Sequence, residues 1–233
     1  MRHELTIDQR LAIALYTGDQ EQALECAKAV KGIFGVAKVG LQLFSAQGPA
    51  IVGQLRQQGF EVFLDLKLHD IPTTVEKAAR VIGSLGVAYA TVHAVGGVEM
   101  VRAALSGLWE GAESAGHPQP QLLGVTVLTS LETASRDELN KRIAILVEAR
   151  SDGLVCAPTD LALVNLKVPN FVKVVPGIRR PQDPRDDQAR VSGPDVAMAA
   201  GADILVIGRP VTAAADCRQA AHEMRSLVEI ATK

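Results

Sequence analysis

The chain has 233 residues, of which 48% are hydrophobic and 3% aromatic, and its formal net charge is -2. A weak negative charge and scarce aromatic residues argue against a nucleic-acid-binding surface, which needs a basic patch or stacking rings. The hydrophobic fraction supports a large core of Ala, Val, Leu and Ile, and the length is typical of one α/β barrel.

The cellular setting is suggested by what the chain lacks. Charged residues precede the first short hydrophobic run, so this start does not resemble a signal peptide. No hydrophobic run approaches 18 residues, so we expect no membrane-spanning segment. The three cysteines, Cys26, Cys156 and Cys217, are widely spaced and follow no metal-binding pattern. We expect free, buried thiols and a cytoplasmic protein with neither nucleic acid nor membrane as a partner.

Short hydrophobic runs alternate with longer amphipathic or Ala-rich stretches along the chain. Helical stretches such as Asp19–Ile33, Thr74–Leu85 and Asp137–Arg150 separate the runs. Eight strands, each followed by a helix, predict an α/β fold, a single (β/α)8 TIM barrel over residues 1–233. The predicted strands are Leu11–Leu15, Val36–Gly40, Glu61–Leu68, Tyr89–Val95, Gln121–Thr129, Gly153–Ala157, Phe171–Pro176 and Ile204–Gly208.

A doubly wound parallel sheet is the alternative architecture. It usually carries a Gly-rich dinucleotide fingerprint in its first turn, whereas the first turn here is Tyr16–Asp19. The one long hydrophilic loop, Arg180–Val191, follows the seventh predicted strand, on the side where barrel active sites lie. A loop of this length is either a functional lid or a solvated excursion, and its composition favours the excursion.

The segment from Asp65 to Thr74 places three charges at the end of a hydrophobic strand. Because strand side chains alternate between faces, Asp65 and Lys67 share a face at its C-terminal end. Asp70 follows, where Ile71 and Pro72 break the strand. Such groups are rarely buried unless they are paired. From the spacing alone, a structural ion pair explains the charges as well as a catalytic site does.

The run Asp-Leu-Lys-Leu-His-Asp-Ile-Pro-Thr-Thr over residues 65–74 resembles the signature of the orotidine 5′-phosphate decarboxylase family. Other strand ends resemble the family as well, so that the resemblance extends from about residue 36 to about residue 212. The resemblance implies a TIM barrel that removes CO2 from orotidine 5′-phosphate to make UMP. That reaction is the last step of de novo pyrimidine biosynthesis, and it needs no cofactor or metal.

The resemblance also implies an alternating catalytic array of Lys38, Asp65, Lys67 and Asp70. Lys67 would donate a proton to C6 of the pyrimidine, and Asp70 would act across the interface of a homodimer. Without the resemblance, Lys38 is better explained as a strand-end lysine that reaches toward water. The substrate-binding residues implied by the family are Lys38, Asp65, Lys67, Asp70, Ile71, Pro72, Thr73, Thr74, Thr129, Ser130, Arg179, Gln188, Gly208 and Arg209.

Two glycine–arginine segments, Gly177–Arg179 and Gly208–Arg209, follow the last two predicted strands. Barrels often build a phosphate site there from backbone N–H groups and a cation. The resemblance assigns the 5′-phosphate to Gln188, Gly208 and Arg209. It assigns the pyrimidine and ribose to Thr129 and Ser130, which ordinary turn chemistry also explains.

The first strand departs from the family pattern. The family strand typically ends Ala-Leu-Asp, with the acid on the substrate ribose, whereas this chain has Tyr16 after Ala14 and Leu15. A phenol cannot replace a carboxylate that accepts two hydroxyl hydrogen bonds. Asp19 lies three residues further on and is a possible substitute. The difference allows a weakened decarboxylase, a shifted substrate or a repacked site.

Two other functions remain open. One is a sugar-phosphate decarboxylase of the keto-gulonate phosphate type, which shares the D-x-K-x-x-D core but generally needs a divalent metal. The other is a catalytically silent pyrimidine-nucleotide-binding protein, which only Tyr16 supports. We interpret His69 and His93 as structural, because a lone histidine is more often a satisfied structural group than a catalyst.

Overall fold

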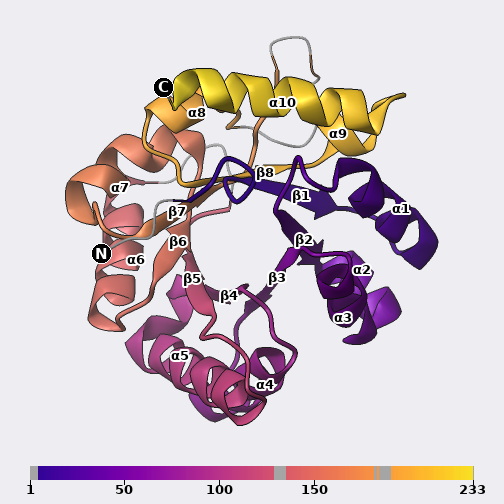
Figure 1. The fold of residues 1–233 in the computed structure, drawn as a ribbon. Coiled ribbons are helices and arrows are strands. Elements are labelled where there is room, and N and C mark those ends of the chain that lie inside the picture. Colours follow the sequence, from indigo (N-terminus) through magenta and orange to yellow (C-terminus); the bar gives the residue numbers. More distant parts are fainter. Residues whose placement is uncertain (1–4, 129–134, 181–182, 184–189, 233) are drawn as a thin grey trace.

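The computed structural model describes residues 5–128, 135–180, 183 and 190–232. Within these residues, eight parallel strands follow one another around a closed barrel, and the last pairs with the first (Figure 1). This confirms the predicted (β/α)8 architecture. The strands are β1 Leu11–Leu15, β2 Val36–Gly40, β3 Glu61–Leu68, β4 Tyr89–His93, β5 Gln121–Val125, β6 Gly153–Val155, β7 Val172–Val175 and β8 Ile204–Ile207.

The first three strands have the predicted bounds, and the other five are shorter than the hydrophobic runs that contain them. β4 ends early because Ala94–Gly96 turn into a 3-10 helix, η1, before α5 begins. The hydrophobic residues beyond the last strand pairs therefore belong to turns at the barrel mouth.

Helices surround the barrel, with α10 lying along the side formed by β8 and β1 (Figure 1). Asp19 and Asp216 cap α1 and α10 by accepting backbone N–H hydrogen bonds. α4 begins at Pro72, two residues before the predicted start, because proline suits the first helical position. The helices are α1 Gln20–Val30, α2 Leu41–Gln47, α3 Ala50–Gln57, α4 Pro72–Ser84, α5 Gly97–Ser114, α6 Arg136–Glu148, α7 Leu161–Lys167, α8 Pro194–Ala199, α9 Arg209–Thr212 and α10 Cys217–Ala231, with a second 3-10 turn, η2, at Pro158–Asp160.

Two hydrophobic layers hold the fold together. The larger lies between the strands and the helices, and the smaller fills the barrel interior around Phe63, Leu123 and Val174. Because side chains alternate along each strand, the interior positions closer to the C-terminal ends are Lys38, Asp65 and Thr91. The hydrophobic core therefore fills the barrel toward the N-terminal ends of the strands and leaves polar groups at the C-terminal ends.

α4 and α5 lie side by side, and glycines allow their backbones to approach closely (Figure 1). A Cβ atom on Gly83 would lie 2.1 Å from the Leu108 carbonyl oxygen, and one on Gly111 would lie 1.9 Å from that of Arg80. The helix that follows the charged segment of β3 is thus fixed against its neighbour by backbone contact.

Among the described residues, no helix has both the length and the hydrophobicity needed to cross a membrane.

Candidate active site

Asp65 lies between two lysines at the carboxyl ends of β2 and β3. Its Oδ2 is 3.3 Å from Nζ of Lys38, and its Oδ1 is 2.8 Å from Nζ of Lys67. Lys38 is only 3% exposed, although it ends in a full positive charge. A buried charge needs such a partner, because an unpaired ion loses its hydration without compensation.

The backbone of β3 is irregular where this cluster forms. Leu64 pairs with Ala90 and Leu68 with Val92, so four residues of β3 pass two residues of β4. Lys67 lies in the left-handed region with φ of 53°, which a non-glycine residue rarely adopts. The predicted regular strand is therefore wrong at this point, although Asp65 and Lys67 do meet as predicted. Backbone strain of this kind often marks functional sites.

Thr91, on the neighbouring strand β4, holds the irregular segment in place. Its hydroxyl accepts a hydrogen bond from the N–H of Lys67 at 2.8 Å and donates one to Oδ1 of Asp65 at 3.1 Å. The sequence analysis missed Thr91. The alternation of Tyr89, Thr91 and His93 on β4 is the signal that could have placed this hydroxyl inside the barrel.

Two opposing effects act on the pKa of Asp65. Burial by itself raises that pKa, but the charges of Lys38 and Lys67 and their hydrogen bonds outweigh burial and lower it from its ordinary value of 3.8. Asp65 is therefore a carboxylate at neutral pH and a fixed anion between two cations.

His93 ends β4 beside this cluster, and its ring centre lies 5.9 Å from that of His69. Burial lowers the pKa of His93, and the nearby His69 and Lys67 lower it further. His93 is therefore neutral at physiological pH and adds no charge to the cluster.

Two cavities open at this end of the barrel, and Leu15 and Tyr16 line both. One, of about 270 Å³, is lined by Lys38, Asp65 and Lys67. The other, of about 440 Å³, is lined by residues at the ends of β7 and β8, namely Pro176, Gly177, Arg179, Gly208 and Arg209, and by Cys26 from α1. A ligand that spans both cavities would meet a charged cluster at one end and arginines at the other.

Tyr16 stands at the junction of the two cavities. Nζ of Lys38 lies 4.7 Å from the centre of its ring, which is the geometry of a cation–π contact. The ring also covers Gly208, where a Cβ atom would lie 2.7 Å from a ring carbon. Asp19, the possible substitute, instead caps α1 by accepting the N–H of Gln22 at 3.0 Å.

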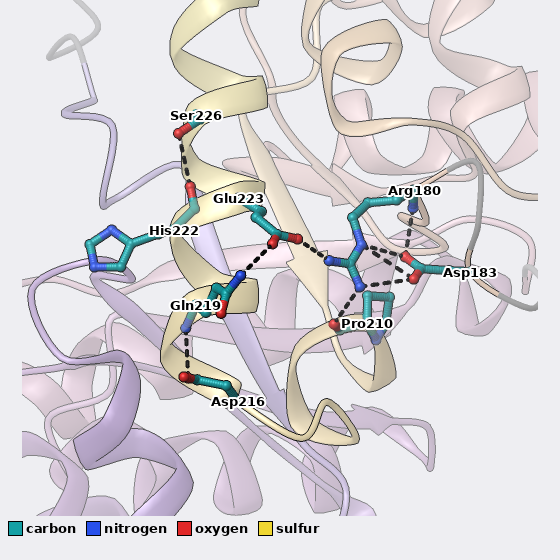
Figure 2. A network of polar contacts seen from close by, with 8 residues as sticks. All are labelled: Arg180, Asp183, Pro210, Asp216, Gln219, His222, Glu223 and Ser226. Carbon is teal, nitrogen blue, oxygen red and sulfur yellow. Dashed lines mark hydrogen bonds and ion pairs between the residues drawn. The ribbon is translucent and has the colours of Figure 1, made fainter.

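Arg180 ties the segment after β7 to the last two helices (Figure 2). Its guanidinium donates to Asp183 at 2.9 Å and to the carbonyl of Pro210 at 3.2 Å, and it forms an ion pair with Glu223 of α10. This network borders a further cavity of about 360 Å³, which Arg179 and Arg209 also line. These polar contacts thus stabilise the position of the segment that lines the cavity with Arg179 and Arg209.

Arg190, further along the chain, also links separate segments through an ion pair and a hydrogen bond. It pairs with Asp160 at 2.9 Å and donates to the carbonyl of Leu128 at 3.1 Å. Most of the Arg180–Val191 loop, which includes Gln188, lies outside the described residues, as do Thr129 and Ser130. The choice between a lid and a solvated loop, and the roles of these three site residues, therefore stay untested predictions.

The predicted site residues thus form separate groups in one chain. Lys38, Asp65 and Lys67 come together, and Arg179, Gly208 and Arg209 line the adjoining cavity. Asp70 is exposed and accepts the N–H of Ile71 at 2.7 Å, and no ion pair joins it to Lys67 in the described part of the chain. Ile71, Pro72, Thr73 and Thr74 are exposed as well.

The structure has the organisation of a TIM-barrel enzyme. It is an eight-stranded barrel, and paired charges and arginine-lined cavities lie at the carboxyl ends of its strands. The chain belongs to the Orotidine 5'-phosphate decarboxylase / HUMPS family, whose model matches residues 9–224. The family resemblance of the strand-end motifs is thereby confirmed.

Similar proteins cover nearly the whole chain. Orotidine 5'-phosphate decarboxylase of Synechococcus sp. (strain WH7803) is 46% identical over 219 residues, which are 89% of this chain and 90% of the relative. That of Thermobifida fusca (strain YX) is 44% identical, over 88% of this chain and 90% of the relative. The crystal structure of the Lactobacillus acidophilus enzyme of the same name matches with a TM-score of 0.79 and 33% identity, over 95% and 99% of the two chains.

Proposed function

We propose that this protein is a carboxy-lyase that converts orotidine 5′-phosphate to UMP, the last step of de novo UMP biosynthesis, without a cofactor. The observation that carries the proposal is the Lys38–Asp65–Lys67 cluster, which lies in a cavity next to one lined by arginines. Family membership and the names of the relatives support the choice of substrate.

Lys67 is the proposed proton donor. Loss of CO2 leaves a carbanion at C6 of the pyrimidine, and the Lys67 ammonium would stabilise this charge before protonating the carbon. Asp65 positions Lys67 through the 2.8 Å ion pair, and Lys38 shares the same carboxylate. Because Thr91 holds the Lys67 backbone, the ammonium is oriented before substrate arrives.

One ion cannot supply the whole rate enhancement. A charge pair near 4 Å contributes about 4 kcal/mol at an effective dielectric constant of about 20, whereas enzymes lower barriers by roughly 8–23 kcal/mol. The remainder must come from preorganised groups and from binding of remote parts of the substrate. We place the 5′-phosphate in the cavity lined by Arg179, Gly208 and Arg209, with Gln188 as a further contact.

The charge balance supports a homodimer. Within one chain, two lysines share the single carboxylate of Asp65, which leaves one surplus positive charge in a largely buried cluster. Asp70 lies on an exposed run that ends with Thr74, where a second subunit could take it up. We propose that Asp70 completes the array of the partner subunit and that residues 71–74 contact substrate at this interface.

The remaining assignments concern the substrate's other contacts and the setting of the enzyme. Thr129 and Ser130 would bind the pyrimidine and ribose, as in the family pattern. The substrate would pass over Tyr16, which lines both cavities. We further propose a cytoplasmic enzyme that has no nucleic acid or membrane partner, in keeping with free thiols in the described structure.

The decisive experiment follows absorbance of the orotate band when purified protein meets orotidine 5′-phosphate in the presence of EDTA. We expect turnover by the wild type and a loss of at least about a thousandfold in Lys67→Ala, because the proton donor is gone. Lys77→Ala, an exposed lysine of α4, is the matched control and should keep wild-type activity.

The other outcomes select the alternatives. Turnover of a sugar phosphate that EDTA abolishes would favour the metal-dependent enzyme of the same superfamily. Binding of UMP without consumption of orotidine 5′-phosphate would favour a catalytically silent nucleotide-binding protein. In that case Tyr16→Asp becomes the next variant, because Tyr16 replaces the acid of the family pattern.

A further inference from the structure

Two of the three cysteines are in contact, although they are 191 positions apart in the sequence. Cys26 lies in α1 and Cys217 is the first residue of α10, and their Sγ atoms are 3.8 Å apart. Cys156 is buried as expected, but Cys26 and Cys217 are only partly buried. All three thiols are free in this structure, as expected, but the expectation that they are buried is wrong for Cys26 and Cys217.

The two sulfur atoms differ in their chemistry. The two Sγ atoms share a hydrogen bond in which either sulfur can be the donor, and this contact raises the pKa of Cys26 and lowers that of Cys217. Burial also raises the pKa of Cys26, and the neighbouring Asp216 opposes the fall at Cys217. Cys217 is also the first residue of α10, and a helix N-terminus favours the reactive thiolate form, so we assign Cys217 as the nucleophilic sulfur and Cys26 as the resolving one.

The surrounding contacts hold the sulfurs together. Arg218 of α10 donates to the carbonyl of Ala29 at 3.1 Å, and Arg225 donates to that of Gly32 at 3.2 Å. These bonds fix α10 along α1, so the sulfurs need to move only from 3.8 Å to the bond length of about 2.05 Å. Among the described residues, no group of three or more metal-ligating side chains is present, which favours oxidation over metal binding.

The pair also borders the candidate active site. Cys26 lines the cavity of about 440 Å³ together with Arg179, Gly208 and Arg209. Cys26 and Cys217 are both partly exposed, so a small oxidant can reach the pair, whereas Cys156 is only 1% exposed. A bond between Cys26 and Cys217 would pull on one wall of the cavity that we assign to the 5′-phosphate.

We propose that Cys26 and Cys217 form a reversible disulfide, a redox-modification site in the wall of the arginine-lined cavity. With hydrogen peroxide as oxidant, the Cys217 thiolate attacks a peroxide oxygen, which breaks the O–O bond, gives a sulfenic acid and releases hydroxide. Sulfur of Cys26 then attacks Cys217, loses its proton and displaces a second hydroxide, which leaves as water. Two thiols and one peroxide thus give one disulfide and two waters.

The test compares wild type, Cys26→Ser, Cys217→Ser and Cys156→Ser before and after peroxide and again after dithiothreitol. We expect the oxidised wild type to lose about 2 Da and to give one peptide that links Cys26 to Cys217, with reversal by dithiothreitol. Cys156→Ser should behave identically, because that thiol takes no part. In Cys26→Ser, Cys217 should gain oxygen instead, because no resolving thiol remains.

Two further readouts follow the consequences of the bond. A link across 191 positions should raise the Tm by roughly 5–10 °C, since it constrains the unfolded chain. The effect on turnover rests on the proposed function: the oxidised enzyme should show a KM for orotidine 5′-phosphate changed by about threefold or more, whereas peroxide should leave the KM of Cys26→Ser unchanged because no disulfide can form there. Failure of all turnover would contradict the proposed function, while the mass readout would still test the disulfide.

Absence of the linked peptide at a peroxide dose that oxidises Cys217 in Cys26→Ser would overturn the disulfide. If the disulfide forms and the KM stays unchanged, the claim that the disulfide alters the arginine-lined cavity is wrong.

Discussion

Tyr16 stands where the family resemblance implied an acid, and its surroundings give the ring a role. The aromatic face meets the ammonium of Lys38 at 4.7 Å while Asp65 binds the same lysine from another side. A ring therefore supplies part of the electrostatic stabilisation that a second carboxylate would otherwise provide, and it leaves the cluster with a net positive charge.

We expect Tyr16→Phe to keep kcat/KM for orotidine 5′-phosphate within about twofold of wild type, because the ring and its contact with Lys38 remain. Tyr16→Leu should lower kcat/KM by roughly 2- to 30-fold, since a cation–π contact contributes about 0.5–2 kcal/mol. Steady-state kinetics check both values. Equal activity of the two variants would show that the ring face does not matter.

The lowered pKa of Asp65 links stability to pH. A carboxyl group whose pKa is lower in the folded than in the unfolded state stabilises the folded protein. This stabilisation is complete when the pH is above the unfolded-state pKa, here 3.8, and it is lost as the pH falls toward the folded-state pKa. The Tm difference between wild type and Asp65→Asn should thus be largest above pH 5 and shrink below about pH 4. Glu113→Gln, at an exposed position, is the control and should show little difference. A gap that widens in acid would contradict the assignment.

At the scale of the elements, the pair of helices after β3 shows how small residues set geometry. α4 carries Gly83 and α5 carries Gly111, and each lies against a carbonyl group of the opposite helix. The helix that starts immediately after Asp70 and Ile71 is thereby held at a fixed distance from its neighbour. Packing of these two helices thus contributes to the position of the charged segment.

Two glycine-to-alanine changes in helices should have opposite effects on stability. At Gly111 the new Cβ would lie 1.9 Å from the Arg80 carbonyl oxygen, so the helices must separate at a cost of about 1–3 kcal/mol. At Gly53 of α3 nothing lies within 4 Å, so Gly53→Ala should gain about 0.5–1 kcal/mol from helix propensity. Thermal unfolding measures both changes. A stabilised Gly111→Ala protein would show that the close contact carries no constraint.

At the scale of the whole molecule, one chain holds a candidate catalytic cluster in which two lysines share one carboxylate, so that its positive charge exceeds its negative charge. The acid that would balance it, Asp70, is exposed and separate from the cluster in the same chain. The proposed symmetric dimer would account for both facts, because a two-fold interface presents the same segment of each subunit to the other.

Mixing two inactive variants tests this arrangement. We expect Lys67→Ala and Asp70→Asn each to lose most activity, and their mixture, after exchange of subunits, to recover about a quarter of wild-type sites. Half of a random mixture consists of mixed dimers, and each mixed dimer has one site with both residues intact. Steady-state turnover before and after exchange measures the recovery. No recovery from mixed dimers verified by mass would place Asp70 in its own subunit's site.

The barrel and much of the charged cluster follow from patterns in the amino-acid sequence. Hydrophobic runs of strand length that alternate with amphipathic helices specify a parallel barrel, and the first three strands matched their predicted bounds. Period-two alternation also placed Asp65 and Lys67 together at a strand end, because that pattern is local. Local patterns follow the chain, so they can be read from neighbouring residues alone.

The contacts between residues far apart in the chain come instead from the three-dimensional fold. The hydroxyl of Thr91 on the Lys67 backbone, the ring of Tyr16 on Lys38 and the contact of Cys26 with Cys217 all depend on how strands and helices close around the barrel. The left-handed turn at Lys67 is likewise imposed by pairing with β4 rather than by the preference of lysine. Contacts between distant segments depend on register and packing, which no local pattern specifies.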